Sequence, residues 1–293
     1  MALSHTINFI LNHPLNKNQR VRAVWRFLRW QLQSRLGSGV TIARFGEKSK
    51  IIVKRGLDGA TGNLYSGLHE FEDMAFLLHF LRSDDLFVDV GANVGSYTIL
   101  ASNECRTQTI AIEPIPQTYD ILKQNIELND VSTLVKVLTI GLGNEKGVLK
   151  FTTNLGAMNQ VAKAYDIDTI DLPVERFDDH ITLDTTTMVK IDVEGFEASV
   201  IEGMTKALEN EHLKAMIIEL NGYGKSFGFD ENLIHQKLLD LHFEPCDYEP
   251  FSRTLIKLNR ANTEKNTIYI RDLEFVSQRL KSARPFTIRG QKV

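Results

Sequence analysis

One segment of the chain limits its fold more than any other feature. The apolar run 86–88 leads into Asp89, which is followed by Gly91, Gly95 and a stretch with the apolar spacing of a helix. Glycine allows a tight turn and a close approach to a ligand, and the first turn of the following helix offers unpaired N–H groups. This order of strand, glycine loop and helix predicts a Rossmann-like nucleotide-binding unit.

Strand and helix patterns alternate after this loop, which favours a parallel sheet with helices on both faces. The expected strands are residues 86–90, 109–112, 134–140, 188–191 and 215–220. The expected helices are residues 94–103, a helix that opens at Pro116, 197–208 and 231–241. Residues 148–153 predict an extra strand, and residues 154–180 are expected to be a loop or insert. Residues 243–248 and 267–270 are expected to form an antiparallel pair at the sheet edge.

The chain before this unit predicts an extension of different character. Residues 40–67 combine short strand-like runs with glycines and suggest a strand and loop lid, and a helix begins near Glu70. We therefore divide the chain into a helical and β-strand extension, residues 1–68, and a Rossmann-like domain, residues 69–293. The fold class is α/β, with a mostly parallel, doubly wound sheet.

Residues 20–36 predict a basic amphipathic helix. Its apolar side chains fall at helical spacing, with arginines between them: Val21, Val24, Trp25, Leu28 and Leu32. Residues 1–40 contain six basic residues and no acidic residue, although the whole chain has a net charge of −3. Two interpretations are open. The stripe packs on the rest of the chain, or it makes peripheral contact with an anionic membrane or a lipid-linked substrate.

Composition and cysteine content exclude several classes of protein. A hydrophobic share of 43% and a charged share of 24% are ordinary for a globular enzyme. Two cysteines are too few for a Cys-rich zinc site or a disulfide scaffold, so a reducing cytoplasm is the expected compartment. The N-terminus lacks a signal-peptide pattern, and no uncharged apolar stretch reaches the roughly 20 residues that a membrane span requires.

The residues of the glycine loop discriminate between nucleotide cofactors. The dinucleotide pattern G-x-G-x-x-G needs glycine at positions 93 and 96, where the chain has Asn93 and Ser96. A carboxylate at Asp89 would repel a pyrophosphate but suits the ammonium and sulfonium groups of S-adenosylmethionine. Glu113 ends the second strand, where an acidic residue of Rossmann domains bonds the ribose hydroxyls. S-adenosylmethionine is therefore the expected cofactor.

The expected cofactor contacts come from the loop and from three other segments. We expect Glu70 to close over the cofactor, and Asn144 or the backbone near Leu142, after the third strand, to meet the adenine. The full set of expected cofactor contacts is Glu70, Asp89, Gly91, Ala92, Asn93, Gly95, Thr98, Glu113 and Asn144.

A second polar group follows the fourth predicted strand, beside the first strand of a doubly wound sheet. Lys190, Asp192 and Glu194 lie at the edge where such folds bind ligands. Methyl transfer to a hydroxyl needs a base, and neighbouring carboxylates raise each other's pKa toward neutral pH. We expect Asp192 or Glu194 to be the base and Lys190 to offset one charge, with Glu219 as a further candidate. The alternative is that these carboxylates only orient the loop or cap the next helix.

These segments resemble the FkbM family of methyltransferases. The resemblance rests on Glu70, residues 88–98, Ile112-Glu113-Pro114, residues 141–147 and residues 189–197. It implies a class I methyltransferase fold and transfer of a methyl group to a hydroxyl, often on a sugar, glycan or polyketide. The basic helix and residues 154–180 lie outside the resemblance and are expected to choose the acceptor.

Other functions fit the sequence less well. A nicotinamide oxidoreductase would need the missing glycines, and nucleic acid is not an expected partner because no Asp/Asn-Pro-Pro-Tyr/Phe motif follows the fourth strand. Two alternatives are kept beside the preferred interpretation, in which the site holds no metal. One is a Mg²⁺-dependent methyltransferase with Asp192, Glu194 and Glu219 as oxygen ligands. The other is a non-catalytic module that binds the cofactor. Oligomeric state does not follow from the sequence.

Overall fold

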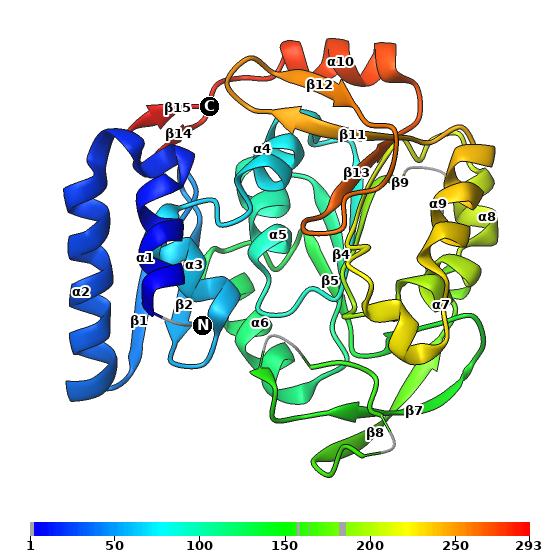
Figure 1. The fold of residues 1–293 in the computed structure, drawn as a ribbon, viewed down its shortest axis with the longest axis horizontal. Helices are drawn as coiled ribbons and strands as arrows, with labels where there is room; N and C mark the ends of the chain where they lie inside the picture. Colours follow the sequence, from blue (N-terminus) through cyan, green and yellow to red (C-terminus); the bar gives the residue numbers. More distant parts are fainter. Residues whose placement is uncertain (1–2, 157–158, 164, 182–185) are drawn as a thin grey trace.

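A computed structural model describes residues 3–156, 159–163, 165–181 and 186–293 (Figure 1). In this part of the chain the central sheet has eight strands in the order β12-β11-β13-β10-β9-β3-β4-β5. The parallel strands are β3 (Leu86–Val90), β4 (Gln108–Ile112), β5 (Val135–Leu138), β9 (Thr186–Ile191) and β10 (Ala215–Ile218). The antiparallel edge is formed by β11 (Glu244–Glu249), β12 (Thr254–Lys257) and β13 (Thr267–Ile270). The predicted α/β class with a doubly wound sheet and an antiparallel C-terminal edge is confirmed.

Helices cover both faces of this sheet, which explains why its inner strands are mostly apolar. Successive residues of β3 point to opposite faces, so Phe87 joins one hydrophobic cluster and Val88 the other. One face packs against α4 (Phe71–Phe80), α5 (Ser96–Ile99), α6 (Pro116–Leu128) and α10 (Leu273–Lys281). The other face packs against α7 (Glu197–Glu202), α8 (Thr205–Glu209) and α9 (Glu231–Asp240). A π-helical turn, Leu100–Glu104, continues α5, and short 3₁₀ turns lie at Phe177–Asp179 and Tyr223–Phe227.

The order of the strands reverses between β3 and β9. The chain runs outward from β3 to β4 and β5 on one side, then returns to β9 and β10 on the other. The loops that follow β3 and β9 therefore leave the sheet next to each other at its carboxyl edge. Ligands of doubly wound sheets bind at such a reversal point.

The N-terminal extension shares its core with the sheet. It consists of α1 (Leu3–Asn12), a 3₁₀ turn (Pro14–Gln19), α2 (Arg20–Leu36), β1 (Val40–Arg44), β2 (Lys50–Lys54) and α3 (Asp58–Ser66). Ile10, Phe27 and Phe45 belong to the same hydrophobic cluster as Phe87 of β3. The C-terminal hairpin of β14 (Thr287–Ile288) and β15 (Gln291–Lys292) lies beside this extension (Figure 1). Among the described residues, no helix combines the length and apolar character needed to cross a membrane.

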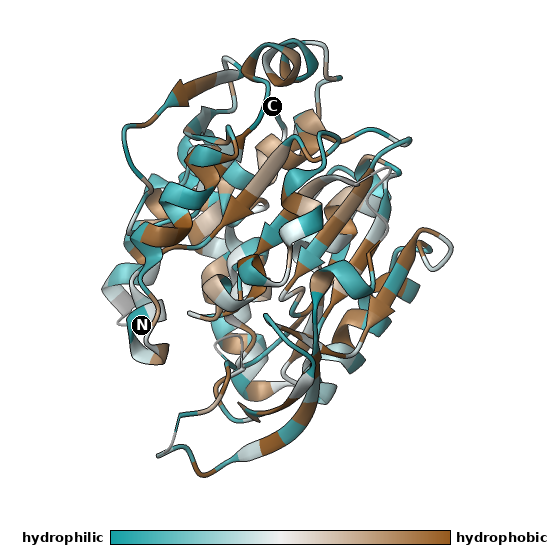
Figure 2. Ribbon diagram, turned by 90° about the vertical axis from the view of Figure 1, so that its right-hand side faces the viewer, coloured by the Kyte–Doolittle hydropathy of each residue, from teal (hydrophilic) through white to brown (hydrophobic). Residues whose placement is uncertain are grey.

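The prediction that residues 154–180 are a loop or insert is wrong for part of that range. Residues Thr169–Glu175 form β8, which pairs with β6 (Gly141–Leu142) and β7 (Gly147–Thr152) in a separate sheet below the central one (Figure 2). Alternating apolar residues signal this strand, but Pro173 argues against it because proline cannot donate a ladder hydrogen bond. β8 is the central strand of this sheet, but β6 pairs only with Val174 and Glu175, so Pro173 is paired on the β7 side alone.

Two segments that contain glycine also differ from their predictions. Residues 58–66 form α3 instead of a loop, and Gly62 in this helix makes room for the His69 ring, which would lie 2.1 Å from a Cβ at this position. The predicted helix 197–208 is divided into α7 and α8 near Gly203. A Cβ at Gly203 would lie 2.2 Å from the carbonyl oxygen of Gly143. Glycine at both positions permits a close tertiary contact.

Helix α2 has the predicted bounds but not the predicted packing. Its buried side chains are Ala23, Phe27 and Trp30, which face α1 and α3. Val21, Trp25, Leu28 and Leu32 are exposed. Val24 is half-buried. Of the two interpretations, packing of this stripe on the rest of the chain does not hold for the four exposed side chains, because a second apolar face of the same helix makes that contact.

Candidate active site

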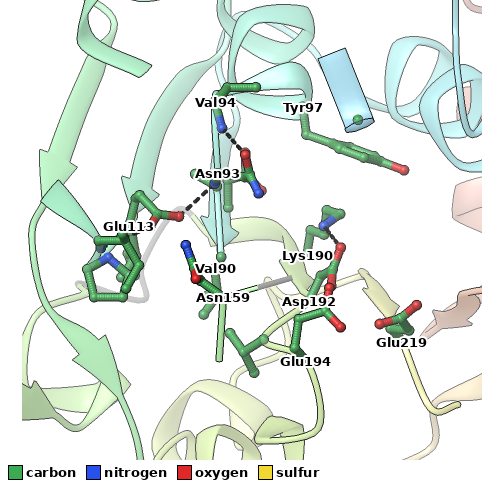
Figure 3. A pocket seen from close by; sticks show the side chains of 18 of the residues that line it. Val90, Asn93, Val94, Tyr97, Glu113, Asn159, Lys190, Asp192, Glu194 and Glu219 are labelled. Atoms are coloured by element: carbon green, nitrogen blue, oxygen red, sulfur yellow. Dashed lines mark hydrogen bonds and ion pairs between the residues drawn. The ribbon is translucent and has the colours of Figure 1, made fainter. Parts of the chain in front are cut away.

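The loops after β3, β4, β9 and β10 surround a cavity of about 270 Å³ at the carboxyl edge of the sheet (Figure 3). Residues from α3, the start of α4 and the segment 159–161 complete its wall. Ten of the residues singled out from the sequence line it: Glu70, Asp89, Gly91, Ala92, Asn93, Glu113, Lys190, Asp192, Glu194 and Glu219. Gly95, Thr98 and Asn144 are not among the lining residues.

The glycines of the loop after β3 are required by packing. Gly91 has φ +78°, and a Cβ there would lie 1.9 Å from the carbonyl oxygen of Asp192. Gly95 has φ +91°, and its Cβ would lie 2.5 Å from Leu122 Cδ1 in α6. Only glycine adopts these angles without strain and leaves room for the neighbour. Gly91 thus allows the loops after β3 and β9 to lie in contact. Gly95 allows the first turn of α5 to pack against α6.

Asp89 is a buried carboxylate in which one oxygen accepts hydrogen bonds and the other is open, without a partner among the described residues. Its Oδ2 accepts hydrogen bonds from the Thr98 backbone N–H at 3.0 Å and from Thr98 Oγ1 at 2.6 Å. Its Oδ1 is buried and has no hydrogen-bond partner among the described residues. Burial raises the pKa of Asp89, and the nearby Lys190 ammonium opposes this rise. An unpaired buried oxygen of this kind is costly and therefore fits a site that takes a donor or cation from a ligand.

Glu113 ties the end of β4 to the glycine loop. Its Oε2 accepts from the Asn93 N–H at 2.8 Å, and its Oε1 accepts from the Ile115 N–H at 2.9 Å. Burial raises the pKa of Glu113 to about 7, although these two N–H groups act in the opposite direction. Each oxygen retains a second acceptor position. The two oxygens therefore match a pair of neighbouring hydroxyl donors, as in a ribose.

Lys190 supplies the positive charge of the site. Its Nζ lies 2.8 Å from Asp192 Oδ2 and 4.8 Å from the centre of the Tyr97 ring. Burial would lower the pKa of Lys190, but Asp192, Asp89 and Glu70 outweigh burial and raise it above its ordinary value. Lys190 is the only lysine or arginine among the described residues that line the cavity. It is therefore a fixed cation and pairs with Asp192.

Three carboxylates meet beside this lysine (Figure 3). Oxygens of Asp192, Glu194 and Glu219 lie within 4.8 Å of one another. Burial, Asp192 and Glu197 raise the pKa of Glu194 to about 7. Burial, with the charges of Asp192 and Glu194, also raises the pKa of Glu219. Side chains that change protonation near neutral pH can accept a proton during catalysis.

The backbone after β9 is shaped to present these groups. Glu194 has φ +55°, an uncommon angle for a residue with a side chain, and Gly195 follows with φ +100°. The buried Glu197 accepts hydrogen bonds from the N–H groups of Val193 and Gly195 at 2.9 and 3.2 Å. Glu197 thus orients the loop that precedes α7. It fills the loop-orienting role considered as the alternative for Asp192 and Glu194, and both of those residues line the cavity.

Three of the expected cofactor contacts do not line the cavity, namely Gly95, Thr98 and Asn144. Asn144 is exposed, and its side chain bonds to Glu202 Oε2 at 3.1 Å and to Ser199 Oγ at 3.4 Å. The geometry does not support the expectation that Asn144 meets the adenine, because the turn after Gly143 directs it toward α7. Thr98 does not line the cavity but donates two hydrogen bonds to Asp89 Oδ2. Glu70, the residue before α4, lines the cavity on the Lys190 side.

Several further residues line the cavity. Asn159, Gln160 and Val161 reach it from the segment between β7 and β8, and Asn159 is labelled in Figure 3. Asn63 reaches it from α3, and His69 from the residues before α4. An apolar part of the wall is formed by Ile115, Leu142, Phe151 and Phe196. Leu142 and Phe196 belong to segments of the family resemblance, whereas Asn63 and residues 159–161 carry no local motif and reach the cavity only through the folding of distant segments.

A doubly wound sheet with an acidic cavity beside its glycine turn is the arrangement expected of a class I methyltransferase. The model of the FkbM methyltransferase domain matches residues 89–250, which is more than half of the chain. The chain belongs to the FkbM methyltransferase family, and S-adenosylmethionine is its methyl donor. The open oxygen of buried Asp89 and the excess of carboxylates in the cavity fit this cationic donor.

Several named methyltransferases are similar to this chain. Hexuronic acid methyltransferase AglP from Haloferax volcanii is 28% identical over 155 residues, which cover 52% of this chain and 62% of that protein. Methyltransferase 1 from Beauveria bassiana is 26% identical over 209 residues, which cover 61% of this chain and 82% of that protein. The crystal structure of methyltransferase FkbM from Methylobacillus flagellatus KT aligns with 85% of this chain and 60% of its own, at 15% identity and a TM-score of 0.45.

Proposed function

We propose that the protein transfers a methyl group to a hydroxyl of a sugar, glycan or polyketide-type acceptor. The observation that carries this proposal is the group of Asp192, Glu194 and Glu219, whose oxygens lie within 4.8 Å of one another beside Lys190. A hydroxyl must lose its proton when it is methylated, and this group offers acceptors for that proton.

The donor is assigned to the part of the cavity between β3 and β4. When bound, S-adenosylmethionine supplies an electrophilic methyl group on a positively charged sulfur. Asp89 offers its open oxygen to the ammonium group, and Glu113 offers its two oxygens to the ribose hydroxyls. The backbone of Gly91, Ala92 and Asn93 forms the adjoining wall. The apolar residues Ile115 and Leu142 replace Asn144 as the proposed surroundings of the adenine.

Glu219 is the proposed base, with Glu194 as the neighbour that keeps its pKa high. The sequence suggests Asp192 as a base, but the structure favours Glu219 over it, because Asp192 Oδ2 lies 2.8 Å from the Lys190 ammonium. That ion pair already engages the oxygen that would have to take up the proton. Glu219 and Glu194 have no such cation at hydrogen-bond distance among the described residues. In its ionised form Glu219 accepts the proton of the acceptor hydroxyl while the new oxygen–carbon bond forms.

A sugar is the favoured acceptor class. The name of AglP assigns a hexuronic acid to that relative. Asn63, His69, Asn159 and Gln160 provide polar side chains at the cavity wall, which suit the several hydroxyls of a sugar.

The acceptor class can be tested with the donor labelled in its methyl group. Purified protein is incubated with matched panels of uronic acids, neutral sugars, phenols and amines, and the product is located by mass spectrometry. We expect an O-methyl ether on a sugar. Methylation of nitrogen, or turnover confined to phenols, would contradict the proposed acceptor without contradicting the family assignment.

Activity is expected to depend on pH through the Glu194 and Glu219 pair. The base form of a carboxylate is present above its pKa, so kcat/KM should rise about tenfold per pH unit below neutrality and level off at alkaline pH. Burial raises the pKa of Glu194 to about 7 and also raises that of Glu219. Glu194→Gln removes a neighbouring negative charge and should move the midpoint to lower pH. A flat profile from acidic to alkaline pH would contradict a carboxylate base.

A Mg²⁺-dependent reaction is a second candidate, because the same three carboxylates could ligate a divalent cation. The proposed reaction needs no metal, since Lys190 already offsets part of the negative charge. We therefore expect the initial rate to change by less than about twofold after exhaustive chelation. A rate that is lost on chelation and restored by Mg²⁺ would favour the second candidate, with these carboxylates as ligands instead of bases.

A further inference from the structure

Helix α2 presents an apolar stripe to solvent on the side opposite its packed face. The stripe consists of Val21, Trp25, Leu28, Leu32 and Leu36, which are 85%, 67%, 49%, 61% and 79% exposed. Their spacing of three or four residues places them on one side of the helix. We propose that this α2 stripe docks on the surface of an anionic lipid bilayer, with the helix lying in the plane of the interface.

The packing of α2 shows that the stripe is not needed to hold the fold together. The helix contacts α1 and α3 through Ala23, Phe27 and Trp30, all of which are buried. Arg26 also points inward, since it donates hydrogen bonds to Asn16 and to the Tyr65 carbonyl. Five large apolar side chains on one exposed helix face are unusual for a surface that contacts only water.

The charges around the stripe indicate an anionic partner. Arg22 and Arg29 lie along one side of it, and Arg20 and Arg35 lie toward the other, at the angular spacing of 3.6 residues per turn. All four arginines are exposed, as is Lys17 before the helix. The sequence contains no acidic residue before Glu47. An apolar face bordered by basic residues is the pattern of helices that lie in the headgroup region of anionic membranes.

This charge pattern disfavours a second copy of the chain as the partner. Packing of two stripes against each other would bring the arginines of one helix against those of the other, with no carboxylate from this segment to compensate. A bilayer supplies both an apolar interior and anionic headgroups. The contact between α2 and α3 also has a consequence for the active site, because α3 contributes Gly59 and Asn63 to the cavity wall. The proposed membrane surface therefore lies one helix away from the cavity.

The two tryptophans of the chain provide a direct test, because Trp25 is exposed and Trp30 is buried. The full-length protein is mixed with phosphatidylcholine vesicles, with and without phosphatidylglycerol, and followed by sedimentation and tryptophan emission. We expect co-sedimentation and a blue shift of the emission with the anionic vesicles only, and weaker binding at high salt. Trp25→Phe should retain binding but lose the blue shift.

Paired variants separate the stripe from the charges. Leu28→Ser with Leu32→Ser, and separately Arg22→Gln with Arg29→Gln, should each weaken binding to anionic vesicles by at least about tenfold. The matched control is Leu233→Ser with Ile256→Ser, since these apolar side chains are exposed on other elements. Thermal unfolding confirms that each variant folds. The proposal would be overturned if the unmodified protein did not bind anionic vesicles, or if a stripe variant bound them normally. A dimer in solution that dissociates on stripe substitution would also overturn it, because it would assign the stripe to a second copy.

Discussion

Glu219→Gln is expected to lower kcat by about 10²- to 10⁴-fold and to leave the affinity for S-adenosylmethionine within about threefold. Glutamine has the shape of glutamate but cannot take the proton of an acceptor hydroxyl. Glu219 directly follows β10 and lies beside the carboxylates of Asp192 and Glu194. The proposed donor contacts Asp89 and Glu113 belong to β3 and to the end of β4, which are two and three strands away in the sheet. The loss should therefore appear in the chemical step and not in binding of the donor.

Single-turnover rates provide the measurement, because slow product release could hide an effect on the chemical step. The matched control is Glu202→Gln, which makes the same chemical change at an exposed carboxylate of α7 that bonds to Asn144. The control should keep normal rates. A Glu219→Gln enzyme with a rate within about threefold of normal would remove Glu219 from the base role and return it to Glu194 or Asp192.

Asp89→Asn is expected to weaken S-adenosylmethionine binding by about 10²-fold, which corresponds to roughly 3 kcal/mol. The substitution removes the negative charge of a buried carboxylate whose Oδ1 is open to the cavity. An asparagine oxygen can still accept from Thr98, so the start of α5 should keep its position. The ammonium of the donor, however, would lose its buried counter-charge.

Calorimetric titration with S-adenosylmethionine measures this effect, and thermal unfolding reports whether the variant folds. Asn144→Ala is the comparison variant, because Asn144 also follows a strand but turns away from the cavity to Ser199 and Glu202. It should bind the donor normally. Equal affinity of Asp89→Asn and the unmodified protein would contradict the proposed donor site, although the family assignment would still hold.

Local sequence patterns predict the parts of the site that lie directly at strand ends. Asp89, Glu113, Lys190 and Asp192 each lie at or just after a parallel strand, and the carboxyl ends of parallel strands meet at one edge. Their approach to a common cavity thus follows from strand order. The roles within that group do not follow from sequence. Asp192 and Glu194 look equivalent in the chain, but the Lys190 contact holds one of them as an ion pair and leaves the other with a raised pKa.

The family motif and the strand and helix periods were therefore sufficient for the fold class, the donor and the carboxylates near β3, β4 and β9. Tertiary structure alone decided the contacts of segments that are distant in the chain. It brought Asn159 and Val161 into the cavity, turned Asn144 away and placed β8 against β7. The tertiary structure also determines which apolar face of α2 is buried. Both faces have helical spacing, and Phe27 is buried while Trp25 is exposed because α1 and α3 pack against the Phe27 side. A periodic pattern records that a side chain can be buried, whereas burial itself depends on which neighbour the folded chain supplies.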